Sequence, residues 1–186
     1  MLYLLGGAAR SGKTIIAQRL LREKGVPCFC VDYFVSGLQH GAPELGILGE
    51  SPNLVRAEKV WPLLVGTLEN IVEVEPQYLV EGDALLPRGV AELRERHYPQ
   101  VRACFLGYPC LTPEQKLRDI RRYRSGVNDW IQDHTDEYIL GLAREMVEFS
   151  RYLEAECREH GLLFFDVSER FADQVAAAYR YLSEGE

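Results

Sequence analysis

The residues best suited to chemistry lie near the start of the chain. Residues 7–14 read G-A-A-R-S-G-K-T, a complete GxxxxGK[ST] pattern placed between an expected strand and an expected helix. Glycines let the backbone amides curl around a phosphate chain, and the helix N-terminus adds the positive end of its dipole. Lys13 then reaches the β- and γ-phosphates, and the Thr14 hydroxyl binds Mg²⁺. The pattern predicts a binding loop for ATP and Mg²⁺, whose residues are Gly7, Ala8, Ala9, Arg10, Ser11, Gly12, Lys13 and Thr14.

The elements that must position this loop follow from the hydrophobic pattern. Short apolar runs alternate with longer segments of helical period, which predicts a parallel sheet covered by helices. The expected strands are residues 2–5, 28–33, 78–81, 101–106 and 162–166. The expected helices are residues 13–24, 53–74, 88–96, 113–124, 136–159 and 169–182. Pro62 either kinks the second helix or begins a new one. Residues 37–52 have no regular pattern and are interpreted as a binding loop or mobile cover.

Composition limits the class of protein. The chain has 186 residues of which 47% are hydrophobic, so we expect a single domain over residues 1–186. Lys and Arg total 21 against 28 Asp and Glu, and this net charge of -7 argues against nucleic acid or a membrane surface as partner. No leader pattern and no apolar run of membrane-span length is found. We expect a cytoplasmic monomer or homodimer whose partner is a small-molecule acceptor.

Three stretches carry a resemblance to a known family. "YLLGGAARSGKT", "VEGDALLP" and "FLGYP" make the chain similar to the P-loop kinases, which include nucleoside, nucleotide, shikimate and gluconate kinases. More closely, it resembles small bacterial proteins described as 2-phosphoglycerate-kinase-like or as uncharacterised ATP-binding kinases. The resemblance implies a three-layer α/β/α P-loop NTPase fold with a five-stranded parallel sheet of order 2-3-1-4-5. It also implies an arginine-rich lid at about residues 116–130 and phosphoryl transfer from ATP.

Acidic residues follow two of the expected strands. Asp32 lies in "CVDYF" at the carboxyl end of the second strand, the edge where ligands bind in parallel sheets. The resemblance makes Asp32 the candidate general base and substrate contact, and the alternative is an Asp that caps a loop amide. Glu81 and Asp83 are one pleat apart in "LVEGDALLP", on the same side of the chain. The resemblance favours Glu81 for the metal and Asp83 for the substrate, although either acid alone could instead cap the following turn.

The third group is basic. Arg118, Arg121 and Arg122 are spaced three and four residues apart in a helix, and Arg124 precedes a Ser-Gly break. P-loop kinases carry lid arginines here that neutralise the transferring phosphoryl group, so Arg118 and Arg122 join Lys13 and Asp32 as candidate catalytic residues. The alternative is a solvated basic helix face.

These expectations together favour a kinase that uses ATP and Mg²⁺. The acceptor is a hydroxyl or a phosphate of a small metabolite, and a nucleoside or nucleotide kinase is the nearest alternative. A regulatory P-loop NTPase that acts through a protein partner is an alternative of another class. The chain has neither an NKxD guanine motif nor a DxxG immediately after the third strand, which argues against that class.

Overall fold

The computed structural model describes residues 1–49, 51–123 and 129–184 of the chain. Within these residues, five strands form one parallel sheet in the order β2-β3-β1-β4-β5, which confirms the predicted order. The strands are β1 (Leu2–Gly7), β2 (Cys28–Cys30), β3 (Tyr78–Gly82), β4 (Val101–Gly107) and β5 (Leu163–Asp166). The first strand thus lies in the middle of the sheet, and the loop that follows it begins at the sheet's carboxyl edge.

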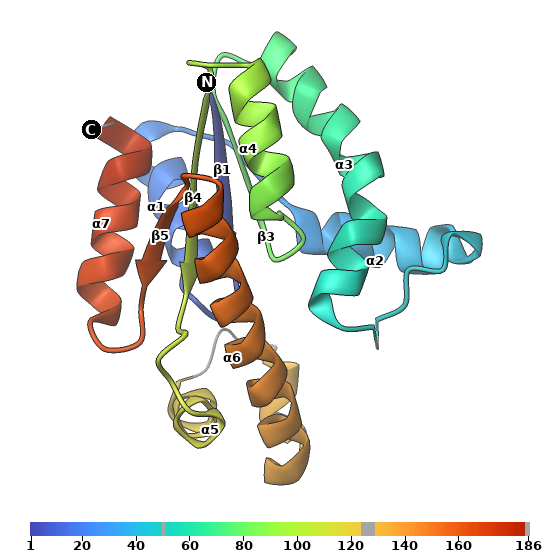
Figure 1. The fold of residues 1–186 in the computed structure, drawn as a ribbon, viewed down its shortest axis with the longest axis vertical. Coiled ribbons are helices and arrows are strands. Elements are labelled where there is room, and N and C mark those ends of the chain that lie inside the picture. The colour runs from blue at the N-terminus through green and yellow to red at the C-terminus, as the bar shows by residue number, and fades with distance from the viewer. Residues whose placement is uncertain (50, 124–128, 185–186) are drawn as a thin grey trace.

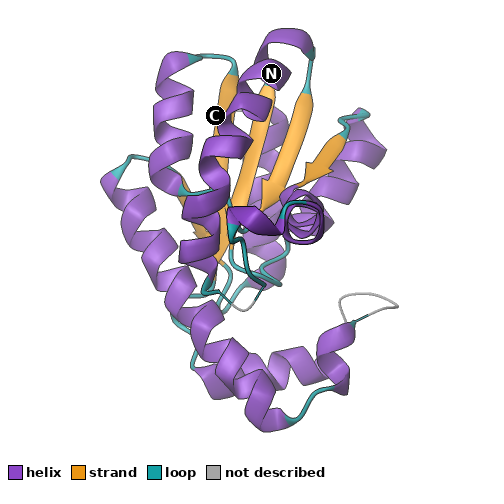
Figure 2. Ribbon diagram, turned by 90° about the vertical axis from the view of Figure 1, so that its right-hand side faces the viewer, coloured by secondary structure: helices purple, strands orange, loops and turns teal. Residues whose placement is uncertain are grey.

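Helices cover both faces of the sheet and extend beyond its carboxyl edge. They are α1 (Lys13–Lys24), α2 (Val31–Gly41), α3 (Asn53–Val74), α4 (Pro87–Arg96), α5 (Pro113–Arg122), α6 (Asp136–Glu159) and α7 (Phe171–Glu184), with short 3-10 turns η1 (Pro43–Leu45) and η2 (Trp130–Asp133). Figure 1 and Figure 2 show α1 and α7 on one face and α4 and α6 on the other. In Figure 1, α5 lies below the sheet and packs against α6. The predicted three-layer α/β/α architecture is therefore confirmed.

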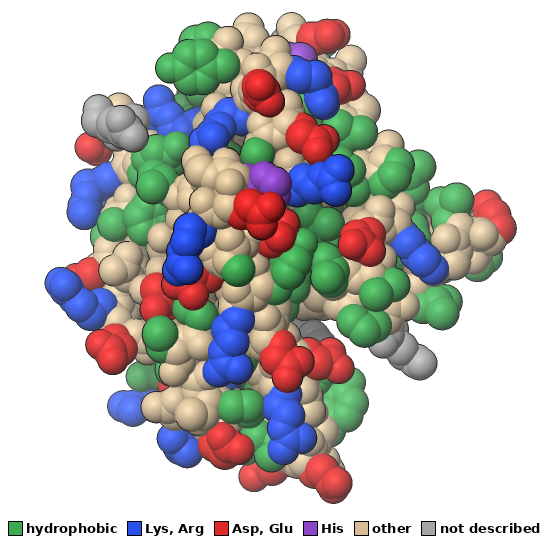
Figure 3. All heavy atoms as spheres, in the orientation of Figure 1, with side chains coloured by type: hydrophobic (Ala, Val, Ile, Leu, Met, Phe, Trp, Pro, Cys, Tyr) green, Lys and Arg blue, Asp and Glu red, His purple; other side chains and the backbone are tan. Residues whose placement is uncertain are grey.

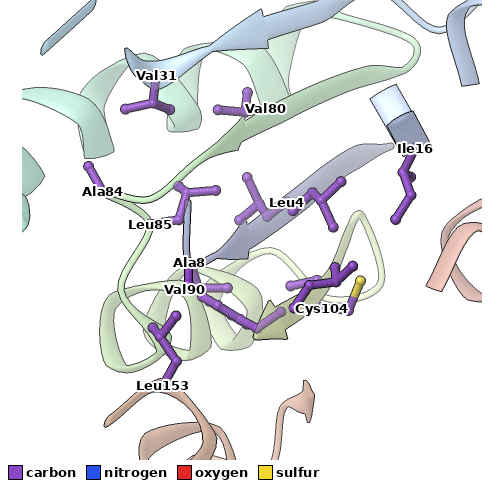
Figure 4. Packing of buried hydrophobic residues seen from close by; sticks show 14 of the residues in the cluster. Leu4, Ala8, Ile16, Val31, Val80, Ala84, Leu85, Val90, Cys104 and Leu153 are labelled. Carbon is purple, nitrogen blue, oxygen red and sulfur yellow. The ribbon is translucent and has the colours of Figure 1, made fainter. Parts of the chain in front are cut away.

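The core explains why the central strands are continuous apolar runs. Every residue of β1 is buried, as expected of a strand with helices on both faces. In Figure 4, side chains of β1, β3 and β4 such as Leu4, Val80 and Cys104 meet helix side chains such as Ile16 and Val90. All five of these side chains are fully buried. The strand that leads into the phosphate loop is therefore buried along its whole length.

The largest departure from the predicted elements follows the second strand. The second strand ends at Cys30 rather than at residue 33, and Asp32 lies in the first turn of α2. Within the stretch 37–52, which was interpreted as irregular, residues 37–41 continue α2 and Pro43–Leu45 form η1. The helix α2 itself is favoured by Val31 and Val35, which are four residues apart and are both buried in the core. Pro62 lies inside α3, which continues through it as one helix.

The surface agrees with the mixed composition. Figure 3 shows acidic and basic side chains interspersed over the face seen in Figure 1. No helix in the described parts of the chain has both the length and the apolar composition needed to cross a membrane.

Candidate active site

The phosphate loop connects β1 to α1 in a conformation that its residue types permit. Gly7 has a φ of 148°, and a Cβ on it would lie 2.3 Å from the carbonyl oxygen of Leu106. Arg10 has a left-handed φ of 59°, which costs a residue with a side chain about 1 kcal/mol. Ala8 donates its amide to the Leu106 carbonyl at 3.0 Å, so β4 fixes the start of the loop. The turn is thus built on close backbone contact with β4.

Lys13 and Thr14 begin α1 and face the same region. Lys13 is 6% exposed, and its ammonium donates to the carbonyls of Gly7 at 3.0 Å and Ala8 at 2.9 Å. Thr14 Oγ1 donates to Glu81 Oε1 at 3.3 Å. The hydroxyl of Ser11 is fully buried and, among the described residues, has no hydrogen-bond partner. A folded-back cation and a buried donor without a partner fit a loop built for an anionic ligand.

The residues also fit Mg²⁺ bound together with phosphates. No group of three His, Cys, Asp or Glu side chains in the described chain is arranged to hold a metal by itself. Mg²⁺ commonly uses one or two protein oxygens and completes its shell with phosphate and water. The Thr14 hydroxyl and the Glu81 carboxylate, which is 4% exposed, are oxygens of this kind. They are the two metal ligands predicted from the sequence.

Asp32 lies beside the carboxyl end of β3, near Glu81. Although Asp32 is an exposed residue as a whole, its Oδ1 would be 3.4 Å from a Cβ on Gly82, so the carboxyl lies against the end of β3. Partial burial and the neighbouring Asp83 carboxylate raise the pKa of Asp32 to about 6, with a further contribution from Glu81. The Lys13 charge opposes this rise. The structure thus brings all three predicted acids together near the lysine.

Arg56 is a site residue that the sequence did not single out. It lies in the first turn of α3 and faces Asp83 at 3.5 Å, and both side chains are largely buried. Arg56 also donates to Asn53 Oδ1 at 2.6 Å and to the carbonyls of Gly49 and Ser51. It therefore joins the acidic group to the segment before α3. Only its place just after the irregular stretch could have indicated this role.

The predicted lid arginines do not share one environment. Arg121 donates to Asp136 at 2.6 Å and to the carbonyls of Gln132 and His134, so it ties α5 to the start of α6. Arg118 and Arg122 are exposed.

Arg122 lies 5.3 Å from the centre of the Tyr123 ring. Arg124 and part of the predicted lid lie outside the described residues. Within the described residues, the hydrogen bonds from this helix to the phosphate loop come from Lys116 and not from an arginine.

Arg10 connects the loop to the segment after α5. Its guanidinium binds both carboxylate oxygens of Asp129 at 2.9 and 3.0 Å and also donates to the Tyr123 carbonyl. The Asp129 side chain is 4% exposed. Both contacts to the carboxylate come from Nη1 of Arg10, and Nη2 is the donor to the Tyr123 carbonyl.

A surface hollow lies elsewhere on the molecule. It has a volume of about 480 Å³ and is lined by α4 residues together with Tyr98 and His160. None of the predicted site residues lines it, so the hollow is separate from the acids and cations described above.

Solved structures share the overall fold of this chain at low sequence identity. A shikimate kinase from Bacteroides thetaiotaomicron has a TM-score of 0.56 at 18% identity, covering 99% of this chain and 96% of that one. A gluconokinase from Sinorhizobium meliloti 1021 has a TM-score of 0.57 at 17% identity, covering 98% and 93%. The chain has the P-loop kinase fold. The YorR protein from Bacillus subtilis, solved with phosphorylated GDP, matches this fold with a TM-score of 0.55 at 15% identity, covering 99% and 96%.

Sequence comparisons add no family assignment. No protein-family model matches the chain, and no curated protein matches it. The P-loop kinase fold therefore rests on the structure, and the narrower resemblance to 2-phosphoglycerate-kinase-like proteins stays a prediction.

Proposed function

We propose that this protein is an ATP-dependent phosphotransferase that moves the γ-phosphoryl group to a hydroxyl or phosphate of a small metabolite. The observation that carries the proposal is geometric: Lys13 is folded onto the carbonyls of the phosphate loop, and the Asp32 carboxyl lies against the end of β3 at the same edge of the sheet. A base and a phosphate-binding cation at one edge of a sheet are the two parts that phosphoryl transfer to an acceptor requires.

The nucleotide side of the reaction belongs to the loop. Lys13 exchanges its contacts with the Gly7 and Ala8 carbonyls for the β- and γ-phosphates. Thr14 and Glu81 hold Mg²⁺ or its water shell. When bound, ATP would supply the phosphoryl group and leave as ADP, and Mg²⁺ would neutralise part of the phosphate charge.

The acceptor side belongs to the acids. Asp32 is mostly ionised at neutral pH, because its pKa of about 6 lies below 7, and it accepts the proton of the acceptor hydroxyl. Asp83 contacts the substrate and is itself held by Arg56. Arg118 and Arg122, which are exposed on α5, are the candidates that neutralise the charge of the transferring phosphoryl group.

The structural neighbours support the substrate class. Shikimate kinase and gluconokinase are named for small-molecule acceptors, and the YorR protein was solved with a phosphorylated guanine nucleotide. A small metabolite as acceptor and a purine triphosphate as donor agree with these names.

The test is a search for the product. The purified protein is incubated with Mg²⁺, ATP and a metabolite extract, and mass spectrometry detects any metabolite that gains one phosphoryl group. Lys13→Ala is the matched control. We expect a phosphorylated product with the natural chain and none with the variant. Steady ATP hydrolysis that is independent of the extract would contradict the proposal.

A further inference from the structure

Lys116 is a buried lysine whose ammonium contacts the backbone of the phosphate loop. It lies on α5, is 5% exposed and shares the buried face of that helix with Ile120. Its ammonium donates to the Arg10 carbonyl at 3.2 Å and lies 3.5 Å from the centre of the Tyr108 ring. Among the described residues, no carboxylate lies within ion-pair distance of this ammonium. A carbonyl and an aromatic face are its contacts.

Such a position disfavours the charge of Lys116 in the free protein. Burial lowers the pKa of Lys116 to about 7, and the charges of Arg10 and Lys13 lower it further, while Asp119 on α5 opposes the shift. A buried cation without an anion costs more than an apolar side chain of the same length. Stability of the fold therefore does not explain why a lysine occupies this place.

Tyr108 and Lys116 donate hydrogen bonds to two consecutive carbonyls of the phosphate loop and thereby orient the peptide groups there. Tyr108 donates its hydroxyl to the Ala9 carbonyl at 2.5 Å, and Lys116 donates to the next carbonyl, that of Arg10. In a trans peptide the N–H points away from the C=O. The amides of Arg10 and Ser11 belong to these two peptide groups, so they point away from Tyr108 and Lys116. A donor on a carbonyl also polarises the peptide and strengthens its N–H as a donor.

We propose that Lys116 is a positioning residue of the nucleotide site: through the Arg10 carbonyl it orients and polarises the loop peptide that binds the phosphates. The inference rests on the proposed function, since it needs a nucleotide in the loop. It differs from the arginines of α5, whose side chains are exposed. The phosphate chain of a bound nucleotide then adds a negative charge that favours the charged form of Lys116, as Asp119 does in the free protein.

Substitution by methionine separates this role from a structural one. Lys116→Met keeps the length of the side chain and removes the charge, and Lys24→Met is the matched control at an exposed lysine. Calorimetry measures the affinity for Mg²⁺-ATP and Mg²⁺-ADP, and thermal unfolding measures stability. We expect Lys116→Met to bind both nucleotides roughly ten- to a hundredfold more weakly, the usual loss for a charged hydrogen-bond donor. We expect its unfolding temperature to be equal or higher, because a buried charge is gone. Lys24→Met should match the natural chain in both measurements.

Proton uptake gives a second readout that a structural role would not move. At pH 8 the free protein holds Lys116 mostly neutral, because its pKa is about 7, and bound phosphates favour the charged form. Mg²⁺-ADP binding measured in buffers of different ionisation enthalpy should therefore show proton uptake by the natural chain, and less by Lys116→Met. If the methionine variant does not fold, Lys116→Gln takes its place.

The outcomes distinguish the proposed function from the role of Lys116. A natural chain that binds neither nucleotide contradicts the proposed function. Nucleotide binding that is equal in the natural chain and Lys116→Met, or lower stability with unchanged affinity, overturns only the role of Lys116.

Discussion

The two sides of the candidate site are built from opposite charges. On the loop side, Lys13 and Lys116 are buried against backbone carbonyls. On the acceptor side, Asp32 and Asp83 are close enough to raise a carboxyl pKa, and Arg56 faces one of them. In the proposed function, the buried cations bind the phosphate chain of the nucleotide, and the crowded carboxylates serve the acceptor.

The largest expected effect comes from the loop side. Lys13→Ala removes the cation from the β- and γ-phosphates, so phosphoryl transfer should fall to background while the fold survives. Turnover at saturating Mg²⁺-ATP and a circular dichroism spectrum measure the two properties. Lys24→Ala, at an exposed lysine, is the control. Unchanged turnover in Lys13→Ala would remove the loop from the mechanism.

A loss of about 10²- to 10⁴-fold is expected on the acceptor side. Asp32→Asn keeps the shape of the side chain and removes its basicity, and this range is usual for a general base. The affinity for ATP should change far less than the turnover. A large loss of ATP affinity with little loss of turnover would place Asp32 in the metal site and leave Asp83 as the base.

The next predicted effect concerns the arginines of α5. In the proposed function they act on the phosphoryl group that passes from the loop side to the acceptor side. Loss of Arg118 or Arg122 should cost about 10³-fold in turnover, the low end for an arginine finger. Arg121→Ala should instead lower the unfolding temperature, because its guanidinium binds Asp136 and two carbonyls. Single alanine variants compared by turnover and thermal unfolding should give this uneven profile. Near-neutral turnover in both Arg118→Ala and Arg122→Ala would make this helix a solvated basic face.

The smallest expected effect is a pH dependence. As the pH falls through the Asp32 pKa of about 6, the base becomes protonated, so turnover should fall about tenfold per pH unit below it. Asp83→Asn removes a neighbouring charge that raises this pKa. Its acidic limb should therefore move to lower pH. If the acidic limb of the pH profile of turnover is unchanged in Asp83→Asn, Asp83 does not influence the pKa of the base.

The parts of the fold that the sequence predicts are those set by local pattern. The phosphate loop, α1, α3 and α6 follow from the motif, from helical period and from terminal signals, and their bounds agree with the structure. The predicted end of β2 was wrong. The helix α2 buries only Val31 and Val35, and two buried residues are too few to distinguish a helix from a strand followed by a loop.

The parts of the site that escaped prediction depend on distant contacts. Lys116 reaches Arg10 across 106 positions of the chain, and in the sequence it is one more charge beside the arginines. Arg56 contacts Asp83 only because α3 begins near the end of β3. The order of the strands determines which charged residues become buried. The local sequence pattern around each charged residue does not contain that information.

Binding of Mg²⁺-ATP to three chains tests the separation of the two sides most directly. Calorimetry compares the natural chain, Lys13→Ala and Asp32→Asn. We expect Lys13→Ala to bind Mg²⁺-ATP much more weakly than the natural chain. Asp32→Asn should bind within about tenfold of the natural chain, because the carboxylate that it lacks serves the acceptor. Equal loss of nucleotide binding in both variants would contradict this separation.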